Sequence, residues 1–256
     1  MLVAAAVCPC PPLLVPEVAA GAAPELDGLR AACDEAVRAV LAADPELVVV
    51  VGPAPASASA AASGTGAVTY EQGTPGTFRP YGVALDVSLG KPGSGTPDDR
   101  LPPSLAVGAW LLDRAGWSGP VRGVQVPDGM ERAANAATGA DLARLADRVG
   151  LLVMGDGSAR RSLKAPGYLD ERAAEVDARI AAALIAADVG ADVDVDLDVD
   201  SGDFLAALDA DLARDLMISG RSPWQVLRGA STGDLTGRLL YDEAPYGVGY
   251  FVVSWV

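Results

Sequence analysis

The residues of this chain that are best suited to chemistry begin with two thiols near its start. Cys8 and Cys10 stand two positions apart in the segment Cys8-Pro9-Cys10-Pro11-Pro12, directly after an apolar run. The chain contains no histidine, although imidazole is the usual general base near neutral pH and the commonest nitrogen ligand of iron and zinc. Any catalysis or metal binding must therefore use thiols, carboxylates, hydroxyls or the backbone.

A second candidate is the segment Gly155-Asp156-Gly157-Ser158, which places a serine on a tight turn after an apolar run. Its spacing differs from that of the nucleophile elbow, and a serine–lysine pair would have to recruit Lys91 or Lys164 from elsewhere in the fold. A turn between a strand and a loop is the favoured interpretation. Gly64-Thr65-Gly66 follows no expected strand and lacks a third glycine, so neither NAD nor ATP binding is predicted.

Composition indicates an acidic globular protein. Half of the 256 residues are hydrophobic, and Lys and Arg number 19 against 34 Asp and Glu, which gives a formal charge of −15. That charge disfavours nucleic acid and anionic membranes as partners. The apolar N-terminal run is too short for a signal segment, and no stretch reaches the ~20 apolar residues of a membrane span. Because three cysteines do not suggest a disulfide framework, we expect free thiols, with Cys33 in the core, and a cytoplasmic protein.

The chain alternates between strand-like and helix-like patterns, which predicts one α/β domain over residues 1–256 with a central sheet flanked by helices on both faces. The expected strands are Leu2–Val7, Leu47–Val51, Val83–Val87, Val121–Val126, Leu151–Met154 and Gly249–Trp255. The expected helices are Pro24–Ala43, Pro103–Ala115, Glu131–Val149, Asp170–Ala187, Asp203–Ile218 and a short one near Pro223–Arg228.

Two stretches without periodicity, Pro53–Pro80 and Lys91–Pro103, are expected to be long loops. From Asp192 to Asp200 every second residue is Asp, which predicts a strand with one acidic face at an edge of the sheet. This segment begins like a calcium-binding EF-hand loop, but Ser201 and Ala207 stand where that loop needs Gly and Glu. Calcium binding is therefore not predicted.

Four segments together resemble the class III extradiol ring-cleavage dioxygenases, in the subunit-B-like branch that also includes Memo-like proteins. They are Cys8-Pro9-Cys10-Pro11-Pro12-Leu13, Gly155–Arg161 leading to Ala165–Tyr168, Gly220-Arg221-Ser222-Pro223-Trp224, and Ala244-Pro245-Tyr246-Gly247-Val248-Gly249-Tyr250. The resemblance spans nearly the whole chain. It implies a mixed sheet flanked by helices, and an Fe(II) ion held by two histidines and a glutamate that binds catechols and O₂.

Carried over by this resemblance, the first histidine ligand corresponds to Cys10, the second lies near Ala54, and the carboxylate corresponds to Glu243. A further acid/base histidine corresponds to Ala159. Alanine has no donor atom, so the inherited positions offer one thiol and one carboxylate, a poor set for Fe(II). We therefore expect no metal cofactor and no ordinary ring cleavage.

Three functions stay open. The first is a metal-free descendant whose cleft binds a small aromatic or anionic molecule or a partner protein. The second is an enzyme with a rebuilt site that uses Cys10, Asp156 and Glu243. The third is a noncatalytic subunit or homo-oligomer, with an interface at the aromatic residues near the C-terminus.

In each case we expect a pocket where four loops at the strand ends meet, since open α/β sheets bind ligands at strand ends. These loops are Pro9–Pro12, Gly52–Ser57, Gly155–Arg161 and Asp242–Tyr246. The side chains expected to contact a ligand there, with Arg160 or Arg161 receiving an anionic group, are Pro11, Ala54, Ser158, Ala159, Arg160, Arg161 and Tyr246.

Overall fold

The computed structural model describes residues 1–54, 66–91, 100–186, 204–233 and 235–256. The strands are β1 (Leu2–Cys8), β2 (Leu47–Pro53), β3 (Val68–Tyr70), β4 (Pro75–Thr77), β5 (Asp86–Ser88), β6 (Val121–Val126), β7 (Val149–Met154), β8 (Gly237–Glu243) and β9 (Tyr250–Trp255). The α-helices are α1 (Pro16–Ala19), α2 (Asp27–Ala42), α4 (Pro103–Arg114), α5 (Arg132–Leu142), α6 (Arg172–Ile185), α7 (Phe204–Ala207), α8 (Ala210–Asp215) and α9 (Arg221–Ala230). Short 3-10 helices are η1 (Pro12–Leu14), η2 (Ala20–Leu26) and η3 (Arg79–Tyr81).

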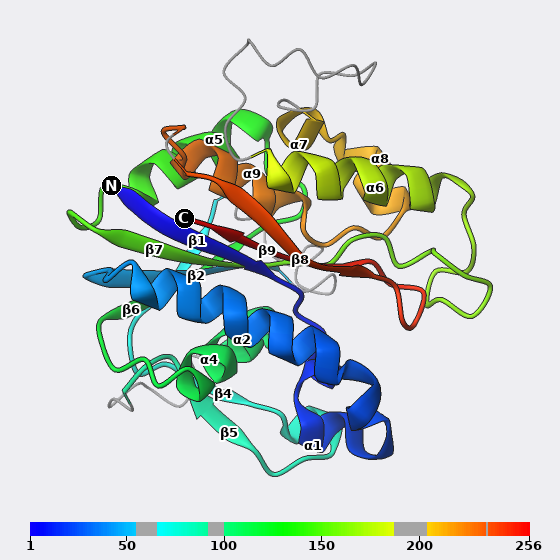
Figure 1. Ribbon diagram of the computed structural model, residues 1–256, viewed down its shortest axis with the longest axis horizontal. Coiled ribbons are helices and arrows are strands. Elements are labelled where there is room, and N and C mark those ends of the chain that lie inside the picture. Colours follow the sequence, from blue (N-terminus) through cyan, green and yellow to red (C-terminus); the bar gives the residue numbers. More distant parts are fainter. Residues whose placement is uncertain (55–65, 92–99, 187–203, 234) are drawn as a thin grey trace.

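A seven-stranded sheet in the order β3-β6-β2-β7-β1-β9-β8 forms the middle layer of the molecule (Figure 1). β6, β2, β7 and β1 are parallel neighbours, whereas β3, β9 and β8 each pair antiparallel with the next strand inward. The parallel strands are almost wholly buried, which is why they are near-continuous runs of Val, Leu and Ala. Because these four strands run the same way, the loops that follow them emerge at one edge of the sheet.

Helices cover both faces of the sheet. In Figure 1, α5 to α9 lie above it, and α1, α2, α4 and the small β4–β5 sheet lie below it. The upper core includes Trp224 and Phe251, whose rings meet edge to face with centroids 6.1 Å apart. The lower core includes Phe78 and Cys33, which is fully buried as the sequence predicted. The predicted α/β class, a mixed sheet flanked by helices on both faces, is confirmed.

The predicted strands of the sheet centre are confirmed, and the errors lie at its margins. The supposed loop Pro53–Pro80 contains β3 and β4, which are too short for periodicity to reveal. The supposed strand Val83–Val87 contributes only its end to β5, and β5 belongs to the separate two-stranded sheet. β8 was not predicted because a register shift between Leu239 and Tyr241 breaks its alternation of side chains.

Two predicted helices are shorter in the structure. The pattern over Glu131–Val149 stops being helical at Leu142, because the chain must reach β7, which begins at Val149. The pattern over Asp203–Ile218 is divided into α7 and α8, since the Asp209 carboxylate accepts hydrogen bonds from the backbone of Asp211 and Leu212 and starts a new helix. The expected acidic strand Asp192–Asp200 lies outside the described residues. Within the described part of the chain, no helix is both long and apolar enough to cross a membrane.

The close packing of α5 on α9 provides a test of this fold. A Cβ at Gly139 would overlap the backbone carbonyl oxygen of Val226, whereas a Cβ at Gly28 in α2 would meet nothing. We expect Gly139→Ala to lower the free energy of unfolding by about 2–3 kcal/mol through overpacking. Gly28→Ala, the matched control, should raise it by about 0.5–1 kcal/mol, as alanine does in an exposed helix. Urea unfolding of both variants measures these effects, and equal stabilities would contradict the packing described here.

Candidate functional site

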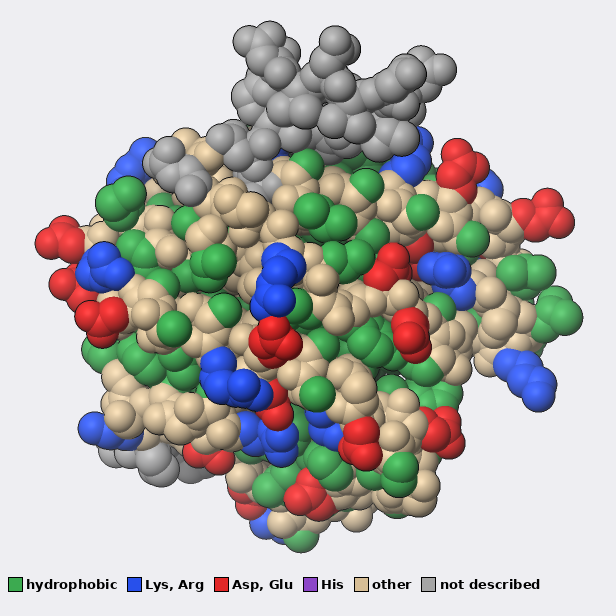
Figure 2. Space-filling view, in the orientation of Figure 1, with side chains coloured by type: hydrophobic (Ala, Val, Ile, Leu, Met, Phe, Trp, Pro, Cys, Tyr) green, Lys and Arg blue, Asp and Glu red, His purple; other side chains and the backbone are tan. Residues whose placement is uncertain are grey.

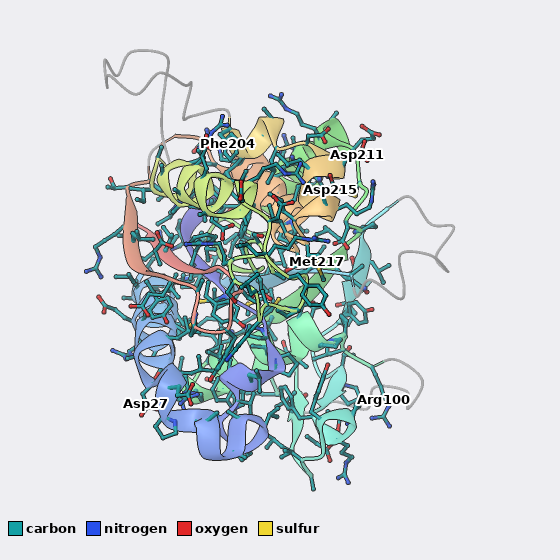
Figure 3. All side chains as sticks on the ribbon, turned by 90° about the vertical axis from the view of Figure 1, so that its right-hand side faces the viewer. Asp27, Arg100, Phe204, Asp211, Asp215 and Met217 are labelled. Carbon is teal, nitrogen blue, oxygen red and sulfur yellow. The ribbon has the colours of Figure 1, made fainter. Side chains whose placement is uncertain are left out.

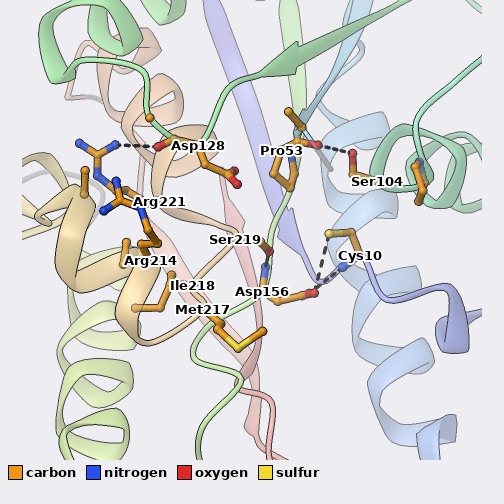
Figure 4. A pocket seen from close by; sticks show the side chains of 15 residues that line it. Cys10, Pro53, Ser104, Asp128, Asp156, Arg214, Met217, Ile218, Ser219 and Arg221 are labelled. Atoms are coloured by element: carbon orange, nitrogen blue, oxygen red, sulfur yellow. Dashed lines mark hydrogen bonds between the residues drawn. The ribbon is translucent and has the colours of Figure 1, made fainter. Parts of the chain in front are cut away.

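A cavity of about 570 Å³ lies at the carboxyl ends of the four parallel strands. We call it the strand-end cavity (Figure 4). Each of the four strands supplies a residue that follows it: Cys10 after β1, Ala54 after β2, Asp128 after β6 and Asp156 after β7. The segment that carries α8 and leads into α9 completes the lining. The lining residues are Cys10, Pro53, Ala54, Pro103, Ser104, Asp128, Gly129, Asp156, Ala210, Ala213, Arg214, Met217, Ile218, Ser219 and Arg221.

The Asp156 carboxylate is the centre of the hydrogen bonds on the cavity floor. Its Oδ1 accepts a 2.8 Å hydrogen bond from the backbone N–H of Cys10, and the Cys10 thiol lies 3.9 Å from its Oδ2. The Asp156 N–H donates to the Ser219 hydroxyl oxygen at 3.0 Å. Burial raises the pKa of Asp156 to about 6, against the opposing effect of the Cys10 hydrogen bonds.

The Cys10 side chain is a protonated thiol in this environment. It is 8% exposed, and burial, followed by the negative charge of Asp156, raises its pKa well above the ordinary thiol value. The Ser219 hydroxyl acts in the opposite direction, but more weakly than these two. Because the thiolate is the reactive form of cysteine, this position does not supply a ready nucleophile.

A second carboxyl group, Asp128, faces the cavity from the loop after β6. Burial raises its pKa to about 6, and the charge of Arg221 only partly offsets that effect. Asp128 Oδ1 is buried and has no hydrogen-bond partner within the described residues. The Arg221 guanidinium does not bond to this carboxylate, because its Nη1 donates to the backbone carbonyls of Asp128 and Met130 and its Nε to that of Leu208.

The remaining walls are mostly apolar. Pro53, Ala54 and Pro103 lie on one side, and Met217 and Ile218 lie on the other. Met217 is 45% exposed and has a backbone φ of 56°, in the left-handed region that a non-glycine residue rarely occupies. Figure 3 places it below α8, whose Asp211 and Asp215 point outward.

The structure brings together three of the side chains proposed from the sequence. Cys10, Ala54 and Asp156 line the strand-end cavity. Pro11 adjoins them but is absent from the lining, and its carbonyl accepts the Leu14 N–H at the start of η1. The part of the loop Gly52–Ser57 beyond residue 54 lies outside the described residues.

The residues after Gly157 turn away from the cavity. Ser158 is fully buried, and its hydroxyl donates to the Leu216 carbonyl. The Ala159 N–H donates to that same carbonyl, which fixes the backbone of this segment to the end of α8. Arg160 is also absent from the residues that line the strand-end cavity, so it does not receive an anionic group there.

Arg161 is engaged elsewhere too. Its Nη1 donates to Asp177, a carboxylate with no exposed surface, at 2.9 Å. The other Asp177 oxygen accepts the Ser158 N–H at 2.9 Å. Since removing one partner of a buried ion pair is costly, Arg161 has a structural task in holding the segment after β7 against α6.

Glu243 and Tyr246 lie apart from the strand-end cavity as well. β8 is the edge strand beyond β9, and the turn that follows it contacts the segment after β7, where the Arg161 N–H donates to the Gly247 carbonyl at 2.9 Å. Glu243 is exposed and accepts a hydrogen bond from Tyr241, and the Tyr246 hydroxyl donates to Glu25 at 3.0 Å. The turn after β8 thus meets the Gly155–Arg161 loop, but the expected contribution of Glu243 and Tyr246 to the pocket is corrected, because neither lines the strand-end cavity.

The donors present do not fit the Fe(II) site that the resemblance implies. Within the described residues no three His, Cys, Asp or Glu side chains are arranged to hold a metal ion. Of the inherited positions, only Cys10 brings a donor atom to the cavity, because Ala54 has none and Glu243 lies elsewhere. Asp156, the other carboxylate beside Cys10, already accepts the Cys10 N–H.

Sequence reasoning missed Asp128, Ser104, Ser219 and Arg221. Asp128 follows the predicted strand Val121–Val126, so the rule that led to Asp156 could have found it. Ser104 is in α4 and donates to the Pro53 carbonyl at 2.9 Å. Ser219 comes from the turn between α8 and α9, which no sequence motif marks, and Arg221 begins α9 within the segment Gly220–Trp224 that contributed to the resemblance but was given no role at the site.

Comparisons with known proteins identify the fold. No protein-family model matches the chain, and no curated protein matches it. Among solved structures, the chain is similar to the crystal structure of an uncharacterized protein, JW3007, from Escherichia coli K12, with a TM-score of 0.56 and 14% sequence identity. The match covers 98% of this chain and 99% of that one. At this identity the likeness concerns the fold alone.

The raised pKa of Asp156 predicts a pH-dependent stability. Folded Asp156 holds its proton up to about pH 6, whereas an unfolded aspartate releases it near pH 4, so stability falls as the pH rises through this window. We expect Asp156→Asn to gain up to about 3 kcal/mol relative to the parent between pH 4 and 7.5. Urea unfolding at four pH values measures this difference.

A second variant controls for general pH effects. Hydrogen bonds from Arg172 hold the pKa of Asp170 at about 2. The contribution of the ionised Asp170 to the free energy of unfolding is therefore nearly complete above about pH 4. The stability difference for Asp170→Asn should therefore stay constant over the same range. A constant difference for Asp156→Asn would show that its carboxyl group titrates normally.

The raised pKa of Cys10 predicts slow alkylation. We expect iodoacetamide at pH 8 to label Cys10 slowly, and severalfold faster in Asp156→Asn, because the substitution removes a negative charge beside the thiol. Mass spectrometry of the labelled peptides gives both rates, with the fully buried Cys33 as the internal reference. Rapid, stoichiometric labelling of Cys10 alone in the parent protein would instead reveal a reactive thiolate.

Proposed function

We propose that this protein binds a small aromatic molecule in the strand-end cavity and does not cleave aromatic rings through Fe(II). The observation that carries the proposal is the cavity itself, which lies at the carboxyl ends of four parallel strands and combines apolar walls with a few convergent polar groups. Ligand sites of α/β sheets occur at this edge and have this mixed lining. Proline, methionine and isoleucine side chains can pack on a ring, while Asp128 and Asp156 accept hydrogen bonds from its substituents.

Descent from the class III extradiol ring-cleavage fold is part of this proposal. Two positions that correspond to metal ligands in the resemblance, Cys10 and Ala54, line one cavity. Ala159 and Glu243 do not join them, so the support is limited to the β1 and β2 ends. The absence of histidine from the whole chain is the reason to separate this protein from the family's iron chemistry.

The alternatives of a rebuilt enzyme and a subunit have less support. An enzyme based on the Cys10 thiolate is disfavoured by the raised pKa of that thiol. A subunit interface at the C-terminal aromatics is disfavoured because Tyr250, Phe251 and Trp255 are buried. Nucleic acid is an unsuitable partner for a chain of charge −15, and on the face in Figure 2 Lys and Arg are interspersed with Asp and Glu. A cytoplasmic location is part of the proposal, since its cysteines are free thiols.

The test combines metal content, oxygen uptake and binding. Untagged protein is incubated anaerobically with Fe(II), desalted, analysed for metal and supplied with catechol and 4-methylcatechol in air. We expect binding of the aromatic compounds, seen as chemical-shift changes at cavity residues, without stoichiometric iron or oxygen uptake. Iron retained near one per chain together with oxygen uptake would contradict the proposal, as would the failure of every aromatic probe to bind.

A further inference from the structure

The geometry points to a ligand that carries an ammonium group, bound so that this group donates to Asp128 while Asp156 supplies a second negative charge. This inference rests on the proposed function and specifies the chemical class of the ligand: a small aromatic amine, in preference to the neutral or anionic molecules of the same shape. It is carried by the hydrogen-bond status of the groups that line the strand-end cavity.

Asp128 Oδ1 is the strongest indication. This oxygen is buried and has no partner within the described residues, although Arg221 is next to it in the lining. A buried acceptor without a donor costs free energy, especially when the group is charged. Figure 4 shows the Asp128 carboxylate directed away from Arg221 and towards the side of the cavity that holds Ser219 and Asp156. The Asp128 carboxylate lines this space, so a donor on a ligand can approach the carboxylate there.

Asp156 adds a second negative charge to the same part of the cavity. One of its oxygens accepts the Cys10 N–H, but the other has only the distant thiol, at 3.9 Å. The charges of Asp128 and Asp156 both act on the Cys10 thiol, so the two carboxylates share this part of the cavity. Two carboxylates in a partly dehydrated space favour a cation.

The cationic side chains of the lining offset only part of this negative charge. Arg221 is 7% exposed, and its donors go to three backbone carbonyls. Arg214 pairs with Asp211 on the outer side of α8. The positive charges are thus committed to protein groups, whereas the negative ones face the cavity. The chain's formal charge of −15 further attracts a cation and repels an anion.

Three phenols that differ only at the end of a short side chain test this inference. Tyramine ends in an ammonium group, tyrosol in a hydroxyl and 4-hydroxyphenylacetate in a carboxylate at pH 7.5. We expect the full-length protein to bind tyramine about tenfold more tightly than tyrosol, the gain of one charge-assisted hydrogen bond, and to bind 4-hydroxyphenylacetate most weakly. Dissociation constants come from NMR titration or calorimetry.

Matched variants test whether Asp128 causes the preference for the ammonium group. Asp128→Asn keeps the side-chain shape and should bring tyramine to within about twofold of tyrosol, while tyrosol binding is unchanged and reports that the cavity is intact. Glu131→Gln removes a nearby exposed charge that is not part of the lining and should leave the preference as it is. If Asp128→Asn loses tyrosol binding as well, the comparison is made with Asp156→Asn, which should also reduce the preference.

The outcomes separate the two proposals. If tyrosol and tyramine bind equally, or the carboxylate binds best, the cation inference is overturned and the aromatic-binding function stands. If the preference exists but survives Asp128→Asn and Asp156→Asn, it does not arise in this cavity and the inference fails. If none of the phenols binds, the proposed function fails with it.

Discussion

Hydrogen bonds around Asp156 hold three distant parts of the chain together, and the strand-end cavity depends on them. The Asp156 carboxylate accepts the Cys10 N–H after β1, its N–H donates to Ser219, and its carbonyl accepts the Gly220 N–H at the start of α9. The backbones approach so closely that a Cβ at Gly155 would overlap Gly220. This contact fixes where α9 begins, and with it the position of Arg221 and the wall formed by Met217 and Ile218.

The sequence predicts the centre of the fold better than its margins, for physical reasons. Strands buried on both faces must be apolar at nearly every position, so β1, β2 and β7 are visible as hydrophobic runs, and β6 is visible through its three valines although it includes Arg122 and Gln125. Edge strands lack that signal: β3 has only three residues, and β8 is half-exposed with an irregular register. The ends of helices depend on tertiary contacts, which is why the pattern after Leu142 continues although the helix does not.

Similar physical reasons decide which residues of the site could be predicted from the sequence. Cys10, Ala54 and Asp156 could be predicted because each follows a strong strand signal, and strand ends meet at one edge of a parallel sheet. Ser219 could not, because a turn between two helices carries no pattern that says which cavity it borders. Glu243 was placed at the site by family resemblance alone, and its strand lies two positions beyond the parallel block, outside β9.

The two carboxyl groups of the cavity support the proposed binding function over a purely structural role for this site. Burial raises the pKa of both Asp128 and Asp156 to about 6, so at neutral pH each ionised group makes the folded state less stable than an uncharged residue would. Asp156 offsets part of this cost by fixing the β1 end, whereas Asp128 Oδ1 has no partner within the described residues, and Arg221 bonds to the backbone carbonyl of Asp128 instead. A group that destabilises the free protein and faces a cavity gains its compensation when a ligand supplies the missing donor. Under the proposed function, the destabilising effect of Asp128 on the free protein would be relieved when a ligand binds.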